Sequence, residues 1–236
     1  MARQVRSEAT RRKILDAAIE VFGDVGYAAA GWSTIIERTG MTKGALYHHF
    51  DSKESLASNI IEEGSDTLLS AFRNVCGASS PGLENLLHGT FTIIEVLSSD
   101  KMAHAAAQLA TALSGFNEAA SRFYANLMLE TAQEARRAIK EGDLRGGIDP
   151  DVLSASIMGT IFGARLVANA ISSHGRIGDI VGDPTARLHQ IWNLLLPGVV
   201  SEASLPYFEQ FLRREEMRHA AAAVVREEAT VQSHTD

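Results

Sequence analysis

Apolar residues recur at helical spacing along almost the whole chain, and this pattern limits the fold more than any other feature of the sequence. Ile14, Leu15, Ala18 and Phe22, for example, share one face of a helix. The alternation typical of strands is scarce. The pattern predicts an all-α protein.

Glycine, proline and capping residues divide the pattern into successive helices. Gly40 ends a short segment, Gly142 follows a long one, and Pro184 begins another. The helices that we expect cover residues 14–22, 33–39, 42–49, 52–74, 83–94, 102–113, 116–140, 149–171, 184–197 and 206–226.

Composition excludes several classes of protein. Of the 236 residues, 45% are hydrophobic and 22% charged, and Cys76 is the only cysteine, which excludes an internal disulfide or a multi-cysteine metal site. Residues 1–12 are polar and basic, so we expect no secretory signal. The most apolar stretch, residues 156–171, contains Arg165 and Asn169 and is too short to cross a bilayer. A cytoplasmic globular protein is expected.

Charge is distributed unevenly along the chain. The net charge is -7, yet residues 1–60 hold eight basic and seven acidic side chains, which leaves the acid excess to the rest. Residues 1–13 contain five basic side chains against the single Glu8, and include Arg3 and Arg6. We expect a basic N-terminal arm that contacts nucleic acid on a near-neutral domain, followed by an acidic body.

The segment from Trp32 to Phe50 has the organisation of a helix-turn-helix. A short helix ends at Gly40, and a second one begins after the capping residue Thr42. The apolar residues expected to hold the two helices together are Ile35, Ile36 and Met41, and Phe50 is expected to be buried.

The second helix of this segment is predicted to enter the major groove of DNA. Lys43, Tyr47 and His48 would be exposed on it, and Gly44 would allow close approach to a base pair or phosphate. His48 and His49 could suggest a metal pair, but adjacent residues point about 100° apart on a helix. No metal site is expected.

Residues 10–56 resemble the DNA-binding domain of the TetR family of repressors. The resemblance rests on Thr-Lys-Gly-Ala-Leu-Tyr-His-His-Phe (42–50) and Ser-Lys-Glu-Ser-Leu (52–56). It implies a three-helix helix-turn-helix domain at 1–51 and a helical ligand-binding and dimerisation domain at 52–236. It also implies that Lys43 contacts base edges, and that the phosphate contacts come from Thr42, Tyr47, His48 and Lys53. Gly31 replaces the family's usual capping threonine, so Ser33 or Thr34 would take over its contact.

A more diffuse similarity connects the chain with the γ-butyrolactone receptors of that family. It rests on residues 1–6 (Met-Ala-Arg-Gln-Val-Arg), 108–112 (Gln-Leu-Ala-Thr-Ala), 148–151 (Ile-Asp-Pro-Asp) and the helix around Trp192. It implies a dimeric repressor that leaves a palindromic operator when a lactone or butenolide binds. Leu127 stands where that subgroup usually has tryptophan, and Gly64 stands where glutamine is expected. A relative that responds to an antibiotic or another apolar ligand is therefore the alternative.

The apolar helical body could hold a ligand with one or two polar groups. The lining residues that we predict are Leu87, Phe91, Phe123, Leu127, Ile157, Thr160 and Trp192, each of which could also be ordinary core. The Thr160 hydroxyl matches a pocket hydroxyl of the subgroup, but the carbonyl of Ser156 could equally be its partner. The family implies that helices 149–171 and 184–197 pair with their copies in a dimer.

Other functions lack support in the sequence. The chain contains no Gly-x-Ser-x-Gly elbow, no His-Glu-x-x-His motif and no cysteine–histidine nucleophile pair, and Gly175 and Gly178 follow an expected helix rather than a strand. We therefore expect no enzyme activity and no cofactor. A helical adaptor that retains a degenerate helix-turn-helix and does not bind DNA is a further alternative.

Overall fold

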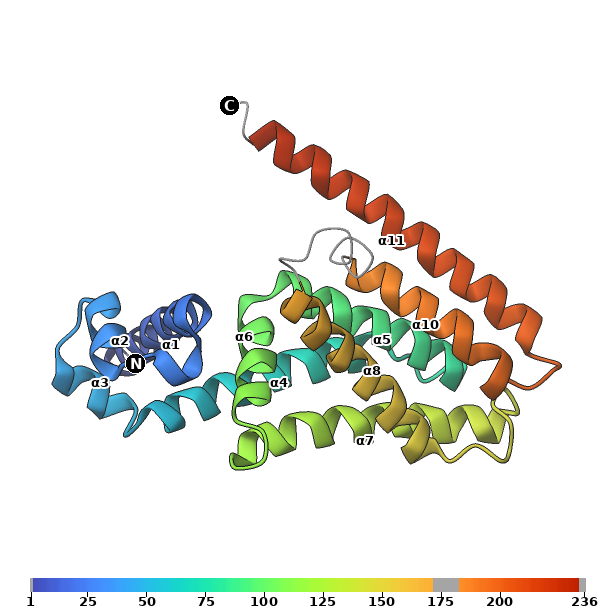
Figure 1. The fold of residues 1–236 in the computed structure, drawn as a ribbon, viewed down its shortest axis with the longest axis horizontal. Coiled ribbons are helices and arrows are strands. Elements are labelled where there is room, and N and C mark those ends of the chain that lie inside the picture. The colour runs from blue at the N-terminus through green and yellow to red at the C-terminus, as the bar shows by residue number, and fades with distance from the viewer. Residues whose placement is uncertain (1, 172–182, 234–236) are drawn as a thin grey trace. The chain divides into compact units, whose positions relative to one another are not determined.

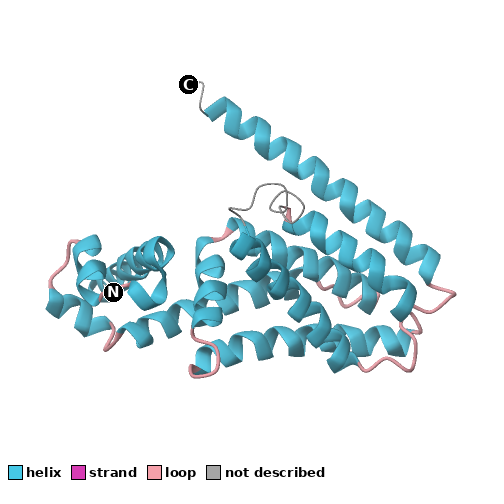
Figure 2. Cartoon of the chain, in the orientation of Figure 1, coloured by secondary structure: helices cyan, strands magenta, loops and turns pink. Residues whose placement is uncertain are grey.

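The described part of the chain is helical, as predicted. The computed structural model describes the backbone of residues 2–171 and 183–233, and the side chains of residues 5–171 and 183–219. Among these residues no strand forms, and Leu144 and Val200 make an isolated bridge (Figure 2). The helices are α1 (Ala2–Ala29), α2 (Trp32–Thr39), α3 (Lys43–His49), α4 (Lys53–Val75), α5 (Gly82–Ser99), α6 (Lys101–Ala112), α7 (Glu118–Glu141), α8 (Pro150–Ile171), α10 (Pro184–Val199) and α11 (Leu205–Ser233) (Figure 1).

Polar side chains define where several helices begin. The carboxylate of Asp100 accepts a hydrogen bond from the Ala103 N–H at 2.8 Å and so caps α6. Asp149 and Asp183 cap α8 and α10 in the same way, each just before a proline in the first turn. The glycine-rich loop expected at 172–183 lies, apart from Asp183, outside the described residues.

The chain divides into two compact units, and both draw on α4, α5 and α7. The first consists of Met1–Ala71 and Val96–Asn126, and the second of Phe72–Glu95 and Leu127–Asp236. In the first unit the predicted face of α1 is buried, with Ile14, Leu15 and Ala18 at 0% exposure. Phe50 is also buried, at 2%, as predicted.

Helix α1 begins earlier than predicted and breaks close to its predicted end. The helix begins at Ala2, so the residues expected to form an arm are its first turns, because Arg, Gln, Glu and Ala favour helical backbone. Its apolar face was expected to end at 23–26, and regular helical geometry does stop there, at Gly26 (φ 76°, ψ 161°), before a short helical segment that reaches Ala29. Such a backbone conformation is open to glycine and strained for other residues.

The core of the second unit is built around Trp192 of α10. Its indole is completely buried, and its Nε1–H donates to Thr90 Oγ1 on α5 at 3.0 Å. The Thr90 hydroxyl donates in turn to the carbonyl of Leu87 at 2.7 Å. All polar atoms of this contact are therefore paired, as burial requires.

Cys76 lies in the loop between α4 and α5. Its thiol faces the Asn85 carbonyl at a distance of 3.8 Å. Burial, together with the nearby charges of Glu134 and Glu130, raises the pKa of this thiol to about 12. The side chain is therefore an uncharged thiol at neutral pH.

A polar cluster fastens α11 to α5 and α10 within the second unit. The nearly buried Glu215 pairs with Arg218, and His88 of α5 lies 4.0 Å from the Glu215 carboxylate. Around them, His219 Nε2 is 3.7 Å from Glu215, and His189 Nε2 is bonded to the Leu212 carbonyl at 2.7 Å. The cluster therefore combines titratable groups from α5, α10 and α11.

Acidification is expected to destabilise this cluster. Burial, with the charge of Arg218, lowers the pKa of His88, so the unfolded chain takes up a proton there more readily than the folded one. Its contribution to stability is present above about pH 6.5 and is lost as the pH falls below that value. We expect the thermal midpoint to fall between pH 7 and pH 5.5, and to fall less in His88→Gln.

Glu215 extends the same trend to lower pH. Burial alone would raise the pKa of this carboxyl, but His219 and the charge of Arg218 lower it below its usual value. Its contribution is present above about pH 4.5 and is lost as the pH falls through the lowered pKa. Identical pH profiles of the wild type and His88→Gln between pH 7 and 5.5 would contradict the role given to His88.

Candidate nucleic-acid interface

The helices α2 and α3 form a helix-turn-helix within the first unit. Gly40, at φ 63°, ends α2 in the left-handed conformation, and its N–H donates to the Glu37 carbonyl. The Thr39 hydroxyl then accepts a hydrogen bond from the Met41 N–H at 3.1 Å. Thr42 caps α3, as predicted, by accepting from the Ala45 N–H at 3.3 Å. Short-range bonds therefore fix the turn.

One face of α3 is exposed and carries the residues predicted to contact DNA. Leu46 faces the core with no exposed surface, whereas Lys43, Gly44, Tyr47 and His48 are exposed. Tyr47 packs edge-on against Trp32 at 5.6 Å between ring centroids, and the Lys43 ammonium lies 5.7 Å from the Tyr47 ring. The two aromatic rings thus support the lysine at the beginning of the helix.

The N-terminus of α2 presents a second group of predicted contacts. Its N-cap, Gly31, makes no side-chain bond, so the first N–H groups of the helix have no side-chain partner there. Ser33 and Thr34 are exposed at this end. A helix N-terminus with free N–H groups favours an anion such as phosphate.

Lys53 has a structural role that sequence reasoning missed. Its ammonium donates to the carbonyls of Tyr27 at 2.8 Å and Ala30 at 2.9 Å, and it lies 4.4 Å from the centre of the Tyr27 ring. It therefore fastens the end of α1 to the start of α4. No local pattern indicates this contact, because its partners lie 23 and 26 residues away in the chain.

The two arginines predicted for the N-terminus stand at the start of α1. Arg6 is exposed on the helix. The side chain of Arg3 lies outside the described residues.

A further arginine, Arg11, was not singled out from the sequence and joins α1 to α4. It pairs with Glu63 and donates to Asn59 Oδ1 at 2.9 Å. Its guanidinium also lies 5.8 Å from the ring of Phe50. The guanidinium beside Phe50, the residue that follows α3, is thus itself bonded to α4.

The residues predicted to line a ligand pocket are mostly buried, but they do not all lie in one unit. Leu87, Phe91, Leu127, Ile157 and Trp192 are at most 1% exposed and belong to the second unit. Phe123, which is equally buried, belongs to the first unit. Sequence periodicity shows which face of a helix is apolar, but not into which core that face packs.

Hydrogen bonds connect several of these positions in the second unit. Trp192 and Leu87 are linked through Thr90, as described above. On the other side, Thr131 bonds to the Leu127 carbonyl at 2.9 Å and to the Ser154 hydroxyl, one turn before Ile157. The Thr160 hydroxyl donates to the Ser156 carbonyl at 2.6 Å, so its partner is in its own helix, which was the alternative considered for this residue.

Exposed apolar side chains occur on both α8 and α10, which contact each other in the second unit, and we call this set the apolar surface of α8 and α10. Its exposed residues are Val152 (61%), Leu166 (58%), Val167 (51%) and Leu194 (82%). Among the described residues, α8 is the single helix long and apolar enough to cross a membrane, by length and composition alone. The stretch 156–171, predicted to be too short to cross a bilayer, lacks the first six residues of this helix. A surface of this kind also suits helix pairing between two copies of a chain.

Metal-binding geometry is not found in the part of the chain that the structure describes: no group of three His, Cys, Asp or Glu side chains there could hold an ion. His48 and His49 are the adjacent histidines considered above as a metal pair. Burial lowers the pKa of His49, and the charges of His48 and Arg11 add to that effect. His49 therefore favours the neutral form.

Two families of known proteins match successive parts of this chain. Residues 14–60 match the tetR family of bacterial regulatory proteins, and residues 79–201 match the tetracyclin repressor-like C-terminal domain. The A-factor receptor protein of Streptomyces griseus is 31% identical over 229 residues, which cover 97% of this chain and 76% of that protein.

Solved structures show the same similarity. A gamma-butyrolactone receptor (ArpA-like protein) has a TM-score of 0.72 at 26% identity and covers 90% of this chain and 99% of its own. CprB from Streptomyces coelicolor, in complex with its biological operator sequence, has a TM-score of 0.71 at 25% identity and covers 87% of this chain and 97% of its own.

The fold and the exposed α3 face therefore define a helix-turn-helix transcriptional regulator. The chain belongs to the TetR family. It is close to the γ-butyrolactone receptors within that family, and like other transcriptional regulators of the family it is not an enzyme.

Proposed function

We propose that the protein is a cytoplasmic repressor that binds a palindromic operator as a homodimer and leaves it when a small apolar signalling molecule binds. The observation that carries this proposal is the exposed face of α3, where Lys43, Tyr47 and His48 lie together on a well-capped helix. Two such helices read a pseudo-palindrome when a dimer places them about 34–36 Å apart. The apolar surface of α8 and α10 would provide the dimer contact.

The contacts with DNA divide into two kinds. Lys43, supported by Tyr47, would hydrogen-bond to base edges in the major groove, since lysine donors suit the O6 and N7 acceptors of guanine. Phosphate contacts would come from Thr42, His48 and the N-terminal end of α2 with Ser33 and Thr34. Gly44 would let the backbone approach DNA, and Arg3 and Arg6 would add charge near the duplex.

A lactone or butenolide is the ligand class that the relatives favour. The similar gamma-butyrolactone receptors are named for such a ligand, and the resemblance to them and to the A-factor receptor protein spans most of this chain. The ligand would contact the buried residues predicted above, of which Trp192 and Leu127 lie in the second unit. An antibiotic or another apolar ligand remains the second candidate, because Leu127 offers no indole at its position.

Helix packing explains the glycine at position 64, which bears on the identity of the ligand. A Cβ atom added at this residue of α4 would lie 2.3 Å from the Ala106 Cβ and 2.8 Å from the Met102 carbonyl oxygen, both on α6. The two helices approach too closely there for any side chain. The glycine therefore reflects local packing of α4 on α6 and is compatible with more than one ligand.

Release of DNA would follow from a population shift. A ligand that binds one conformation of the dimer more tightly favours that conformation by its difference in affinity. If the favoured conformation holds the two α3 helices at an unsuitable spacing, the operator is released. We propose that α4 transmits the change, because its residues belong to both units.

The base contact is tested by Lys43→Ala. We expect operator affinity to fall by roughly 1–3 kcal/mol, or about 5- to 150-fold, with discrimination lost at one base position. Fluorescence anisotropy with an operator duplex and its single-base variants measures both effects. Lys101→Ala, an exposed lysine outside the helix-turn-helix, is the matched control and should bind as the wild type does.

Lys53→Ala separates the two roles open to that residue. A phosphate contact predicts weaker binding of all sequences and a salt dependence lower by about one unit of slope. The contacts with Tyr27 and Ala30 predict instead a lower thermal midpoint of the DNA-binding domain. If Lys53→Ala and Lys43→Ala alter sequence discrimination in the same way, the division between base and phosphate contacts is wrong.

The ligand response is tested with the natural source of the signal. A palindromic duplex from the DNA flanking the gene is titrated with the protein, with and without organic extract of the producing culture. Release by the extract supports a signal-gated repressor and provides an assay for purifying the ligand. Operator affinity that is unchanged by saturating ligand would contradict the proposed regulation. DNA binding that is absent or independent of salt would favour the helical adaptor.

A further inference from the structure

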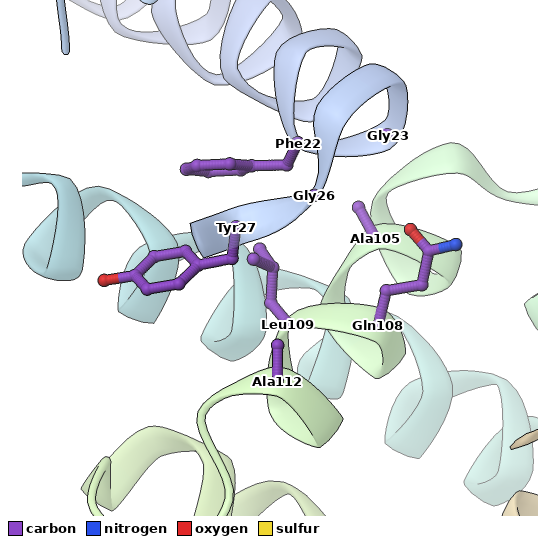
Figure 3. Close-up of a pocket in the computed structure, with 8 residues that line it drawn as sticks. All are labelled: Phe22, Gly23, Gly26, Tyr27, Ala105, Gln108, Leu109 and Ala112. Carbon is purple, nitrogen blue, oxygen red and sulfur yellow. The ribbon is translucent and has the colours of Figure 1, made fainter. Parts of the chain in front are cut away.

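A cleft of about 210 Å³ lies between α1 and α6 in the first unit (Figure 3). Its floor is apolar: Phe22, Ala105 and Leu109 line it and are 5%, 5% and 2% exposed. None of these residues belongs to the set predicted to contact the signalling ligand. The cleft is therefore a separate feature of the molecule.

The rim of the cleft is exposed and uncharged. Gly23, Gly26 and Ala112 form part of it, and Gln108 adds an amide that can donate and accept hydrogen bonds (Figure 3). The rings of Phe22 and Tyr27 are tilted by 41° at a centroid distance of 5.6 Å. Two aromatic side chains and the Gln108 amide thus belong to the lining of the same cleft.

The break in α1 explains why this space stays open. At Gly26 the helix departs from helical geometry (φ 76°, ψ 161°), so the side chains before and after it do not continue one packed face. A Cβ atom added at Gly23 or at Gly26 would meet no atom within 4 Å. Neither the glycines nor their neighbours fill the cleft.

We propose that this cleft binds a small, uncharged aromatic molecule with one hydrogen-bonding group. A cavity of roughly 150 Å³ with apolar walls is known to accept benzene, so the larger cleft suits one or two fused rings. An ion would lose its hydration there without gaining an opposite charge, because no lining residue is charged. The amide of Gln108 would pair with the polar group of the molecule.

Occupancy of the cleft would alter DNA binding. The molecule would touch Gly26 and Tyr27, and the carbonyls of Tyr27 and Ala30 are held by Lys53. Lys53 begins α4, and only residues 50–52 separate it from the end of α3. This consequence rests on the proposed function, whereas binding itself does not.

Binding is tested on the full-length chain with indole as the probe. Alanine methyl groups are labelled with ¹³C, and their NMR signals are followed during a titration. We expect saturable shifts of the Ala105 and Ala112 methyl signals that exceed those of alanines outside the cleft. We also expect Ala112→Leu, which fills the mouth of the cleft, to weaken indole binding at least tenfold. Ala125→Leu places the same side chain on an exposed position of α7 and should leave binding unchanged.

Two results would overturn the site: shifts that spread evenly over the alanine methyls, or equal affinity of Ala112→Leu and the wild type. If Ala112→Leu does not fold, Gly23→Ala takes its place, because its methyl group enters open space on a helix. Operator binding is measured separately with indole present. Saturable indole binding with unchanged operator affinity would retain the site and refute its coupling to DNA.

Discussion

Leu194→Glu is expected to abolish the dimer and to lower operator affinity by about 10²- to 10⁴-fold. Leu194 is 82% exposed and lies on the apolar surface of α8 and α10. A carboxylate there would have to be buried without a partner when two copies associate. Loss of the dimer removes the gain in avidity that two linked half-site contacts provide, which is of that order.

Analytical ultracentrifugation and operator titration measure the two effects of Leu194→Glu. Leu129→Glu is the matched control, since Leu129 is 61% exposed on α7 in the same unit and lies outside that surface. The control should remain dimeric and bind DNA normally. A dimeric Leu194→Glu would mean that the copies associate through another surface.

Trp192→Ala is expected to lower the free energy of unfolding by about 3–5 kcal/mol, because it leaves a large cavity in the core of the second unit. The change also leaves the Thr90 hydroxyl without the donor that it accepts from at 3.0 Å. Trp192→Phe keeps most of the volume and removes the hydrogen bond, so a loss of about 1 kcal/mol is expected.

Urea unfolding followed by circular dichroism measures these losses in the absence of ligand. Phe116→Ala, at a residue 68% exposed, is the control for removing an aromatic ring and should change stability little. A small effect of Trp192→Ala would contradict the packing role given to the indole.

Much of the fold could be predicted because local rules determine it. The Thr42 cap requires only a hydroxyl and the backbone N–H three residues ahead. Gly40 favours the left-handed conformation that ends α2. The buried face of α1 follows from the 3.6-residue period. These features depend on residues within about two turns of one another, so one sequence is enough to see them.

The remaining features depend on contacts between distant parts of the chain. Lysine is a residue type expected to contact phosphate, and only the fold reveals the two carbonyls that bind the Lys53 ammonium. Phe123 lies on an apolar face, but the unit to which it belongs depends on how α7 packs. Position 64 is glycine, where the subgroup is expected to have glutamine, because α6 lies too close for a side chain; α6 begins 37 residues later.

Cys76 makes the protein convenient to label at chosen positions. Burial raises the pKa of its thiol, so the group stays protonated at pH 7, and maleimides react with the thiolate. A cysteine introduced at an exposed position such as Ser33 would therefore be modified first, with the native residue left in place. Spin labels attached there in both copies of a dimer would report the separation of the two DNA-reading ends directly, in solution and at each ligand concentration.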